Sequence, residues 1–268
     1  MTVPRAVRVA GVTLRAGMQV QLANKGDLIM SIANGVTYQI TVVLFATVIF
    51  GQFPALSGWS GGEILLVTSV RLLAHSGHML LFGNLLWTAE LIRQDRVDTW
   101  RVRPVSLFTQ ICTFQAPVNA LGDMVVAATA LSICLGMLDI VWTPLRILGL
   151  VGAIGVGMMI EAALVTHIAA LGFRWRGMDA LYPWLDNLLT QFAGYPLTIF
   201  PKLVAHLFTF GLPLGYIAYY PVSWILGKQS DLPGGAWLAA ATPLVALAWL
   251  ATAIWHWRAG LRALARNP

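Results

Sequence analysis

Long apolar stretches alternate with short polar segments along the whole chain. Stretches at about residues 28–50, 64–92, 114–138 and 144–173 are each long enough for a helix to cross a hydrocarbon core. A further apolar region covers about 188–226, and a last one covers about 237–257. Continuous runs of this kind predict helices, since a membrane barrel would show short segments of alternating polarity. The pattern predicts an all-α integral membrane protein with about six transmembrane helices in a single domain, residues 1–268.

The apolar region at about 188–226 differs from the others, because it is too long for one span and is interrupted by proline. Pro196, Pro201, Pro213 and Pro221 lie within it, and each proline removes a backbone donor from a helix. Irregular backbone at membrane depth is tolerated only where it packs against protein or lines a cavity. We therefore expect a fifth span followed by a re-entrant segment on the external side.

The first 25 residues predict an element that lies along the membrane. Apolar residues recur at three- and four-residue steps from Val7 to Leu22, while Arg5, Arg8 and Arg15 take the other side. This pattern predicts an amphipathic helix in the headgroup plane over residues 1–25. A short soluble cap packed on the bundle is the alternative. The segment has no continuous apolar run, so we do not interpret it as a cleavable signal peptide.

The distribution of basic residues orients the predicted spans. The chain is 58% hydrophobic and only 10% charged, with a net charge of +6. One side of the membrane would receive thirteen of the 17 basic residues, namely Arg5, Arg8, Arg15, Lys25, Arg93, Arg96, Arg101, Arg103, Arg174, Arg176, Arg258, Arg262 and Arg266. The other side would receive Arg146 and Lys228. Positive charge gathers on the cytoplasmic side of membrane proteins, so both termini are expected in the cytoplasm, and the surplus does not indicate a nucleic-acid partner.

A dense group of charges, the charged segment, occupies residues 93–104 between the second and third predicted spans. It holds four arginines and two aspartates together with Val97 and Trp100, and Pro104 closes it. An ordinary cytoplasmic loop explains the arginines but neither the aspartates nor the tryptophan. A helix that docks on a soluble partner explains all of them, because arginine and tryptophan dominate interface hot spots. We expect a short helix that directs Asp98, Trp100 and Arg101 outward, with Asp95, Arg96 and Arg103 in the same docking site.

Ionisable residues within the apolar stretches are the next candidates for a functional site. Placing each of them inside a membrane costs several kcal/mol of free energy unless it is paired or hydrated. Arg71, His75 and His78 share one face of the second predicted span at about 100° per residue. Glu161 and His167 lie in the fourth. These residues could line a substrate path or relay protons, or they could only pair between helices, as Arg71 would with Glu161. Intramembrane histidines also allow haem ligation, and the sequence leaves these alternatives open.

A stripe of small residues marks the fourth predicted span. Gly149, Ala153 and Gly157 repeat every four residues, which lets another helix approach closely. That helix could belong to the same bundle or to another subunit.

No motif in the chain indicates catalysis. The phosphate-binding pattern G-x-x-x-x-G-K-[ST] is missing, and Gly227-Lys228-Gln229 lacks both its glycine spacing and its hydroxyl. No nucleophile elbow G-x-S-x-G occurs either. We interpret Leu56-Ser57-Gly58-Trp59 as an external turn, with Trp59 at the membrane interface. The chain is not expected to hydrolyse ATP by itself.

The sequence resembles the permease subunits of bacterial ABC transporters of the type-2 exporter class, within the branch of ABC-2 family transporter proteins. The resemblance lies in Gly58-Trp59-Ser60; in Val97 to Pro104, which is similar to the family's D-x-x-L-x-R-P; in Gly194-Tyr195-Pro196-Leu197 with Phe200-Pro201; in Leu212-Pro213 with Tyr219-Tyr220-Pro221; and in Trp257 to Arg262. Asp95-Arg96 stands where a glycine is common in the family, and Trp100 where leucine is common.

The resemblance implies two kinds of partner for the chain and a role for two of its segments. Two permease chains would pair, identical or related, and each would bind a cytoplasmic ATPase that carries the ATP and Mg²⁺. Residues 1–25 would form an elbow helix and residues 93–107 a coupling helix, in the lipid of the bacterial cytoplasmic membrane. This chain would bind no cofactor, and the cargo would be a drug or a lipid-like molecule. A stand-alone transporter driven by protons through Glu161 and the histidines, and a haem-binding redox subunit, are the alternatives.

Overall fold

The computed structural model describes residues 11–12, 15, 17, 19, 22–23, 25–52, 55–175 and 177–266. Within these residues the chain is helical, apart from its turns and an isolated bridge between Leu56 and Trp59. The predicted all-α class is confirmed. Most of the amphipathic helix predicted over residues 1–25 lies outside the described residues.

Four helical stretches in the described part of the chain are long and apolar enough to cross a membrane. They are Gly61–Arg93, Asn119–Met137, Pro144–Gly172 and Trp237–Leu264. The first comprises α3 (Gly61–Phe82), the 3₁₀ turn η1 (Gly83–Trp87) and α4 (Thr88–Arg93), and the others belong to α7 (Asn119–Met137), α8 (Pro144–Gly172) and α12 (Trp237–Arg266). They correspond to the second, third, fourth and last predicted spans. The first predicted span is α2 (Lys25–Gln52), a helix of 28 residues.

Local sequence signals set the starts of two of these helices. Thr143 caps α8 by accepting a hydrogen bond from the backbone N–H of Arg146, and Pro144 occupies the first turn, where its missing N–H costs nothing. Ser60 caps α3 in a capping box with Glu63, so each side chain accepts from the other residue's backbone N–H. Both helices therefore begin where their capping residues place them.

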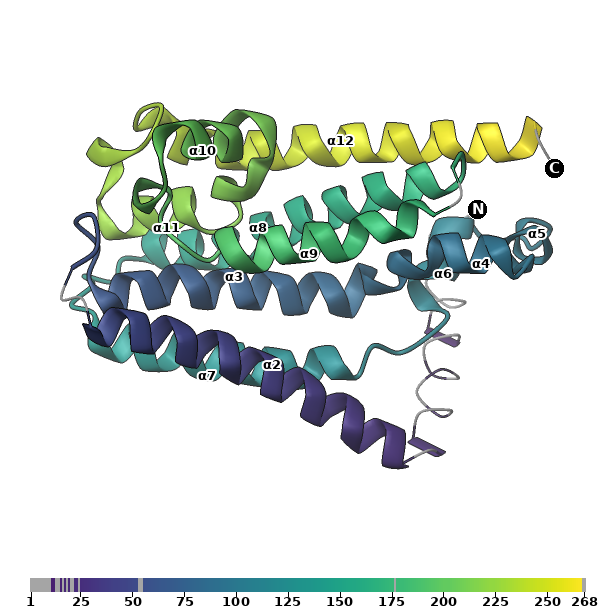
Figure 1. Cartoon of the computed structure of the whole chain (residues 1–268), viewed down its shortest axis with the longest axis horizontal. Helices are drawn as coiled ribbons and strands as arrows, with labels where there is room; N and C mark the ends of the chain where they lie inside the picture. The colour runs from purple at the N-terminus through teal and green to yellow at the C-terminus, as the bar shows by residue number, and fades with distance from the viewer. Residues whose placement is uncertain are drawn as a thin grey trace.

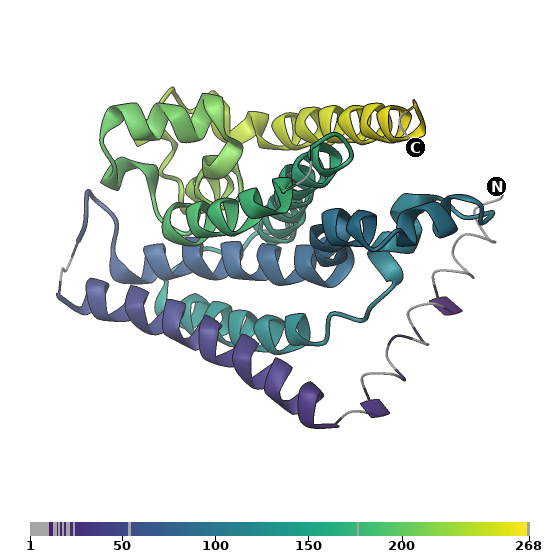
Figure 2. The ribbon, with the colours of Figure 1, turned by 45° about the vertical axis from the view of Figure 1, so that its right-hand side comes forward.

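The long helices pack side by side in the order α12, α8, α3, α7 and α2, as Figures 1 and 2 show. Helix α3 lies between α7 and α8, and this position explains why most of its residues are buried. Helix α2 contacts α7 and α3 at the edge of the bundle. The core therefore lies along α3 and α8.

The region predicted as a fifth span is not a continuous helix, and this part of the prediction is wrong. Helix α9 (Leu181–Phe192) has 12 residues, or a length of about 18 Å, which is too short to cross a bilayer. After Gly194 and Pro196 the chain forms only short elements. They are η3 (Leu197–Ile199), α10 (Lys202–His206), the π-helical turn η4 (Leu207–Gly211), η5 (Pro213–Tyr216), α11 (Tyr219–Leu226) and η6 (Gln229–Asp231). Helix α11 packs against α3, α8 and α12, so the proline-broken backbone rests on protein.

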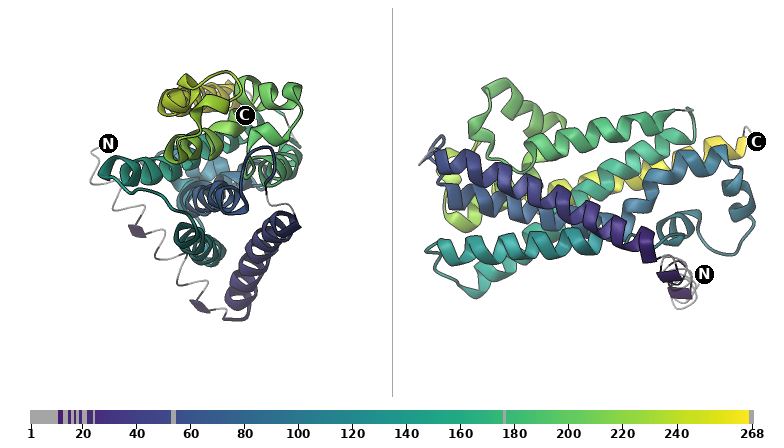
Figure 3. Two further views of the ribbon diagram at one scale, coloured as in Figure 1. Left: turned by 90° about the vertical axis from the view of Figure 1, so that its left-hand side faces the viewer. Right: turned by 60° about the horizontal axis from the view of Figure 1, so that its bottom comes forward.

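Most of the described arginines gather at one end of the bundle, which we call the basic end. Helix α4, the short helices α5 (Arg96–Arg101) and α6 (Leu107–Thr113), and the C-terminal end of α12 lie there (Figures 1 and 3). These elements carry Arg93, Arg96, Arg101, Arg258 and Arg262, Arg103 follows α5, and Arg174 follows the end of α8. Arg146 lies instead in the first turn of α8, and Lys228 follows the end of α11. The charge asymmetry of the sequence is thus an asymmetry between the two ends of the fold.

Candidate functional site

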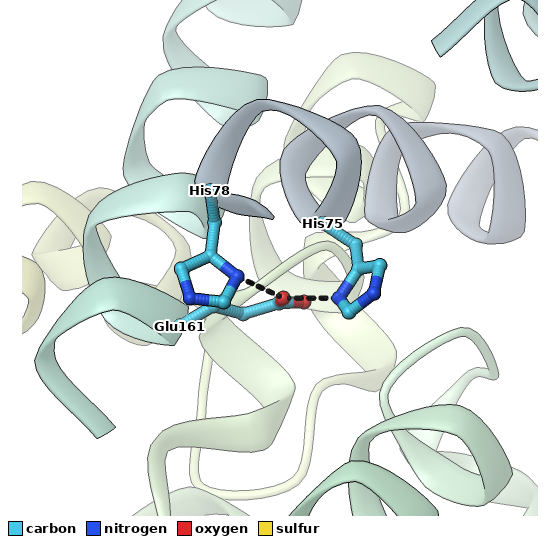
Figure 4. Close-up of side chains that lie close together, drawn as sticks. All are labelled: His75, His78 and Glu161. Atoms are coloured by element: carbon cyan, nitrogen blue, oxygen red, sulfur yellow. Dashed lines mark hydrogen bonds and ion pairs between the residues drawn. The ribbon is translucent and has the colours of Figure 1, made fainter. Parts of the chain in front are cut away.

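A group of ionisable side chains lies inside the bundle, between α3 and α8. Arg71, His75 and His78 follow one another at steps of four and three residues along α3, so all three point toward Glu161 on α8 (Figure 4 shows the two histidines). His75 Nδ1 donates to Glu161 Oε2 at 2.8 Å, and His78 Nδ1 lies 3.5 Å from the same oxygen. Arg71 Nε lies 3.6 Å from Oε1. The structure brings four of the five predicted intramembrane residues together.

This charged cluster is almost completely removed from solvent. Glu161 has an exposed fraction of 0%, and the guanidinium nitrogens of Arg71 make no hydrogen bond with any of the described residues. The arginine side chain carries a positive charge in proteins, and inside the bundle such a charge needs a counter-ion, which the carboxylate of Glu161 supplies. The opposite charges of Arg71 and Glu161 therefore compensate each other, and the cluster joins α3 to α8.

The geometry of the cluster also resembles a metal site. One ligand atom from each of His75, His78 and Glu161 lies within 4.8 Å of the others, and a set of two imidazoles and one carboxylate suits a divalent transition metal. However, the guanidinium of Arg71 stands beside the same carboxylate and would repel a cation. The arrangement fits an ion pair with two histidine partners better than a metal site.

His167 lies apart from the charged cluster and pairs with a different residue. Its Nδ1 lies 3.0 Å from Nδ1 of His256 on α12, and its ring meets Trp249 edge-on with centroids 5.7 Å apart. Sequence reasoning missed His256, and it also missed Asp123 on α7, which interacts electrostatically with His75. An isolated ionisable residue in an apolar stretch is the signal that would have found both.

The small residues of α8 face the interior of the same chain. A Cβ atom on Gly157 would lie 2.5 Å from the carbonyl oxygen of Ile217 and 2.8 Å from Cβ of Ala74. A Cβ atom on Gly149 would lie 2.5 Å from the ring of Trp224, and Ala153 is buried between these two positions. The stripe thus allows α3 and the segment around α11 to approach α8 closely.

The charged segment forms a sharp turn followed by α5. Asp95 begins the turn in the left-handed conformation, with φ of 55°, which is a conformation that glycine and aspartate accept more readily than most residues. Asp98 and Arg101 are exposed on α5, where Nη1 of Arg101 lies 3.4 Å from Oδ1 of Asp98. Arg103 follows the helix and is exposed as well.

Trp100 does not point outward, and this expectation is wrong. Val97 and Trp100 are three residues apart on α5, so they share one helical face, which packs inward and leaves only 6% of Trp100 exposed. The Trp100 ring lies 5.8 Å from the ring of Phe114, and the guanidinium groups of Arg96 and Arg103 lie 5.1 and 5.9 Å from its centroid. Trp100 therefore anchors the charged segment to the bundle.

We expect the Trp100→Ala variant to loosen α5 without unfolding the bundle. Removing a buried tryptophan costs about 3–5 kcal/mol, and α5 has only six residues to hold it in place. Trypsin should then cleave after Arg101, which Val102 follows, at least about tenfold faster than in the wild type. The control is Val102→Ala, because Val102 is 86% exposed. Equal cleavage of the wild type and the Trp100 variant would refute the anchoring role.

The opposite end of the bundle is tied together by Lys228. The turn predicted at Leu56–Trp59 is present: the backbones of Leu56 and Trp59 are paired, and Ser57 and Gly58 have positive φ. Nζ of Lys228 donates to the carbonyl oxygen of Gly58 and to Glu63, each at 2.7 Å, and lies over the ring of Trp59. Trp59 is buried against Tyr219 rather than placed at the membrane interface as predicted. The ring is enclosed within the fold by Tyr219 on one side and the ammonium group of Lys228 on another.

These features define the class of the protein as a multi-pass α-helical membrane protein. The sequence model of the family described as ABC-2 family transporter protein matches residues 36–266. The chain therefore belongs to the ABC-2 transporter family and is a permease subunit of an ABC transporter. No curated protein and no solved structure matches it.

Proposed function

We propose that this permease forms half of the translocation pathway of an exporter and is driven by a separate ATPase that binds the charged segment. The basic end would face the cytoplasm, as the positive-inside bias favours, in the bacterial cytoplasmic membrane. A second permease chain, identical or related, would complete the pathway. ATP and Mg²⁺ would be bound by the ATPase, and this chain would contribute no catalytic residue.

The observation that supports this proposal is that α5 has a charged, exposed outer face and an inner face that is held against the bundle. Its outer face presents Asp98 and Arg101 to solvent, while its inner face is held by Trp100 and Val97. The side-chain Nε2 of Gln110 on α6 also donates to the carbonyl oxygen of Trp100 at 3.0 Å. A charged surface on an anchored helix can transmit a displacement to α4 and α3, which precede it along the chain. Such coupling requires contacts that differ between the two states of the transporter.

A proton-driven secondary transporter is the second candidate, and the charged cluster favours it. The hydrogen bond between His75 and Glu161 is buried beside Arg71, where a change of protonation would unbalance the charges. Transport by the permease alone in response to a pH gradient, with no ATPase present, would support this candidate. ATP-dependent transport that is indifferent to the pH gradient would support the exporter.

We expect the exchange Asp98→Arg with Arg101→Asp to abolish ATPase binding. The exchanged pair keeps an ion pair three residues apart on α5, so the helix loses little stability. A partner that is complementary to the original charges would instead meet like charges, which costs several kcal/mol. Co-purification of the ATPase should fall by about tenfold or more, while the amount of permease in the membrane stays unchanged.

The matched control is Arg258→Asp, which changes an exposed charge at the same end of the bundle but outside the charged segment. It should retain the ATPase. If the exchanged pair binds the ATPase as the wild type does, α5 is not the docking site. The exchange leaves the net charge unchanged, so if Arg258→Asp loses the ATPase equally, the ATPase binds the basic end as a whole and not the charged segment in particular.

A further inference from the structure

We propose that the permease binds an acidic amphiphile from the membrane in a cleft beside the charged segment. This inference deepens the proposed function, on which it rests, by naming a class of cargo and the place where it enters. The cleft consists of two adjoining cavities at the basic end, of about 460 and 340 Å³, which share Leu86, Trp87 and Gln115 in their walls. Cavities of this size are typical of small-molecule sites.

The larger cavity offers uncharged hydrogen-bonding groups. It lies between η1, the connection from α6 to α7, and the start of α9, and its wall contains Asn84, Gln115 and Asn119. Asn84 is 5% exposed, and its Nδ2 donates to the carbonyl oxygens of Cys112 and Gln115 at 2.9 and 2.7 Å, which leaves its Oδ1 free to accept. Among the described residues, the side chains of Gln115 and Asn119 have no hydrogen-bond partner. Gln115 is exposed and Asn119 is half-buried, so their amide groups are accessible donors and acceptors for a molecule with hydroxyl or carbonyl groups.

The smaller cavity adds a positive charge. Glu90, Arg93 and Arg96 line it, and Glu90 is paired with Arg93. The guanidinium of Arg96 lies over the rings of Trp100 and Phe114, at 5.1 and 5.8 Å, and no carboxylate pairs with it among the described residues. Stacking on two rings leaves the N–H edge of Arg96 free for an anion. The charge at this rim therefore favours a phosphate or carboxylate group.

Exposed aromatic residues indicate the depth of the cleft in the membrane. Trp87 in its shared wall is 52% exposed, and Trp184 on the adjacent α9 is 60% exposed. Tryptophan is enriched at the boundary between headgroups and acyl chains. A molecule in the leaflet at the basic end would thus reach the cleft with its acidic group at Arg96. The polar part of the molecule next to the acidic group would lie against the amide side chains of the larger cavity, and its apolar chain would run past Met79 and Trp87.

Photolabelling of the complete complex tests this assignment. The permease and its ATPase would be placed in phosphatidylcholine nanodiscs with dodecyl phosphate that carries a diazirine in its chain. We expect saturable labelling of the peptides that contain residues 79–87 and 115–119. Dodecyltrimethylammonium with the same diazirine should label these peptides at least about fivefold less. Arg96→Gln should reduce labelling by the phosphate probe about tenfold, as expected for loss of one charge-assisted hydrogen bond.

Two further variants separate the site from ATPase docking. Arg96 belongs to the charged segment, so Gln115→Leu is used as a second variant, because Gln115 lies outside that segment and its side chain makes no hydrogen bond in the described structure. Gln115→Leu should lower labelling about threefold with the ATPase still bound. Arg258→Gln, which changes an arginine in the wall of a different cavity, should leave labelling unchanged.

The outcomes distinguish this inference from the proposed function. Equal labelling by the two probes, or labelling that both Arg96→Gln and Gln115→Leu leave unchanged, would overturn the assignment. An active complex with no labelling at these peptides would overturn it too, and would leave the ATPase-driven mechanism standing. Specific labelling of a permease that binds no ATPase would support the site and refute the ATPase-driven mechanism.

Discussion

Replacing Glu161 by glutamine is expected to destabilise the protein by about 3–5 kcal/mol, because the change leaves Arg71 as an uncompensated charge inside the bundle. Glutamine has nearly the same shape as glutamate, so the loss measures charge and not packing. His75 also loses the carboxylate to which its Nδ1 donates. The melting temperature of the detergent-solubilised protein should fall by about 10 °C, a size estimated from the entropy of unfolding.

A double variant separates stability from transport. Arg71→Met combined with Glu161→Gln removes both charges, and removal of a complete buried pair is often neutral for stability. We expect most of the lost melting temperature to return. If transport returns with it, the charged cluster only pairs helices; if transport stays lost in the stable protein, the cluster acts in translocation. A Glu161→Gln variant that melts with the wild type would show that Arg71 does not depend on this carboxylate.

Replacing Gly157 by leucine should prevent correct folding. The first added carbon would lie 2.5 Å from the carbonyl oxygen of Ile217 and 2.8 Å from Ala74, and backbone atoms cannot move aside as a side-chain end can. Either α8 must separate from α3 or the segment before α11 must shift, and overpacking of this kind costs about 1–3 kcal/mol or more. Because the clash involves a backbone atom, we expect the upper end of that range. The yield of monodisperse protein after extraction is the measurement.

The matched control for this test lies on the same helix. Gly152 has no neighbouring atom within 4 Å of its missing Cβ, so Gly152→Leu adds the same side chain into open space. It should fold at least as well as the wild type, since leucine has the higher helix propensity. Equal yields from the two leucine variants would show that the close approach at Gly157 does not determine the fold.

The sequence predicted which residues share one face of a helix. It also predicted where a helix begins, if the start is marked by a residue such as proline. Pro144 begins α8 as expected, and the spacing of Arg71, His75 and His78 placed them on one face of α3. Both results follow from local geometry, because the period of the α-helix and the properties of proline do not depend on the rest of the fold.

What could not be predicted depends on contacts between distant segments. The burial of Trp59 depends on Tyr219 and Lys228, and the partner of His167 lies on α12. The cleft beside Trp87 combines three elements far apart in the sequence. The prolines predicted an interrupted region after Pro196, but an apolar run gives no sign of where its helix begins and ends, so the short length of α9 appeared only in the structure.

The contacts of Lys228 have a mechanical consequence for the transport cycle. Its ammonium group joins the turn before α3, the first turn of α3 and the end of α11 through Gly58, Glu63 and the ring of Trp59. The ion pair between Lys228 and Glu63 is partly shielded from water, which makes it stronger than a surface pair. Lys228 thereby joins α3 to the segment around α11 at this end, so a tilt of α3 would move α11 with it.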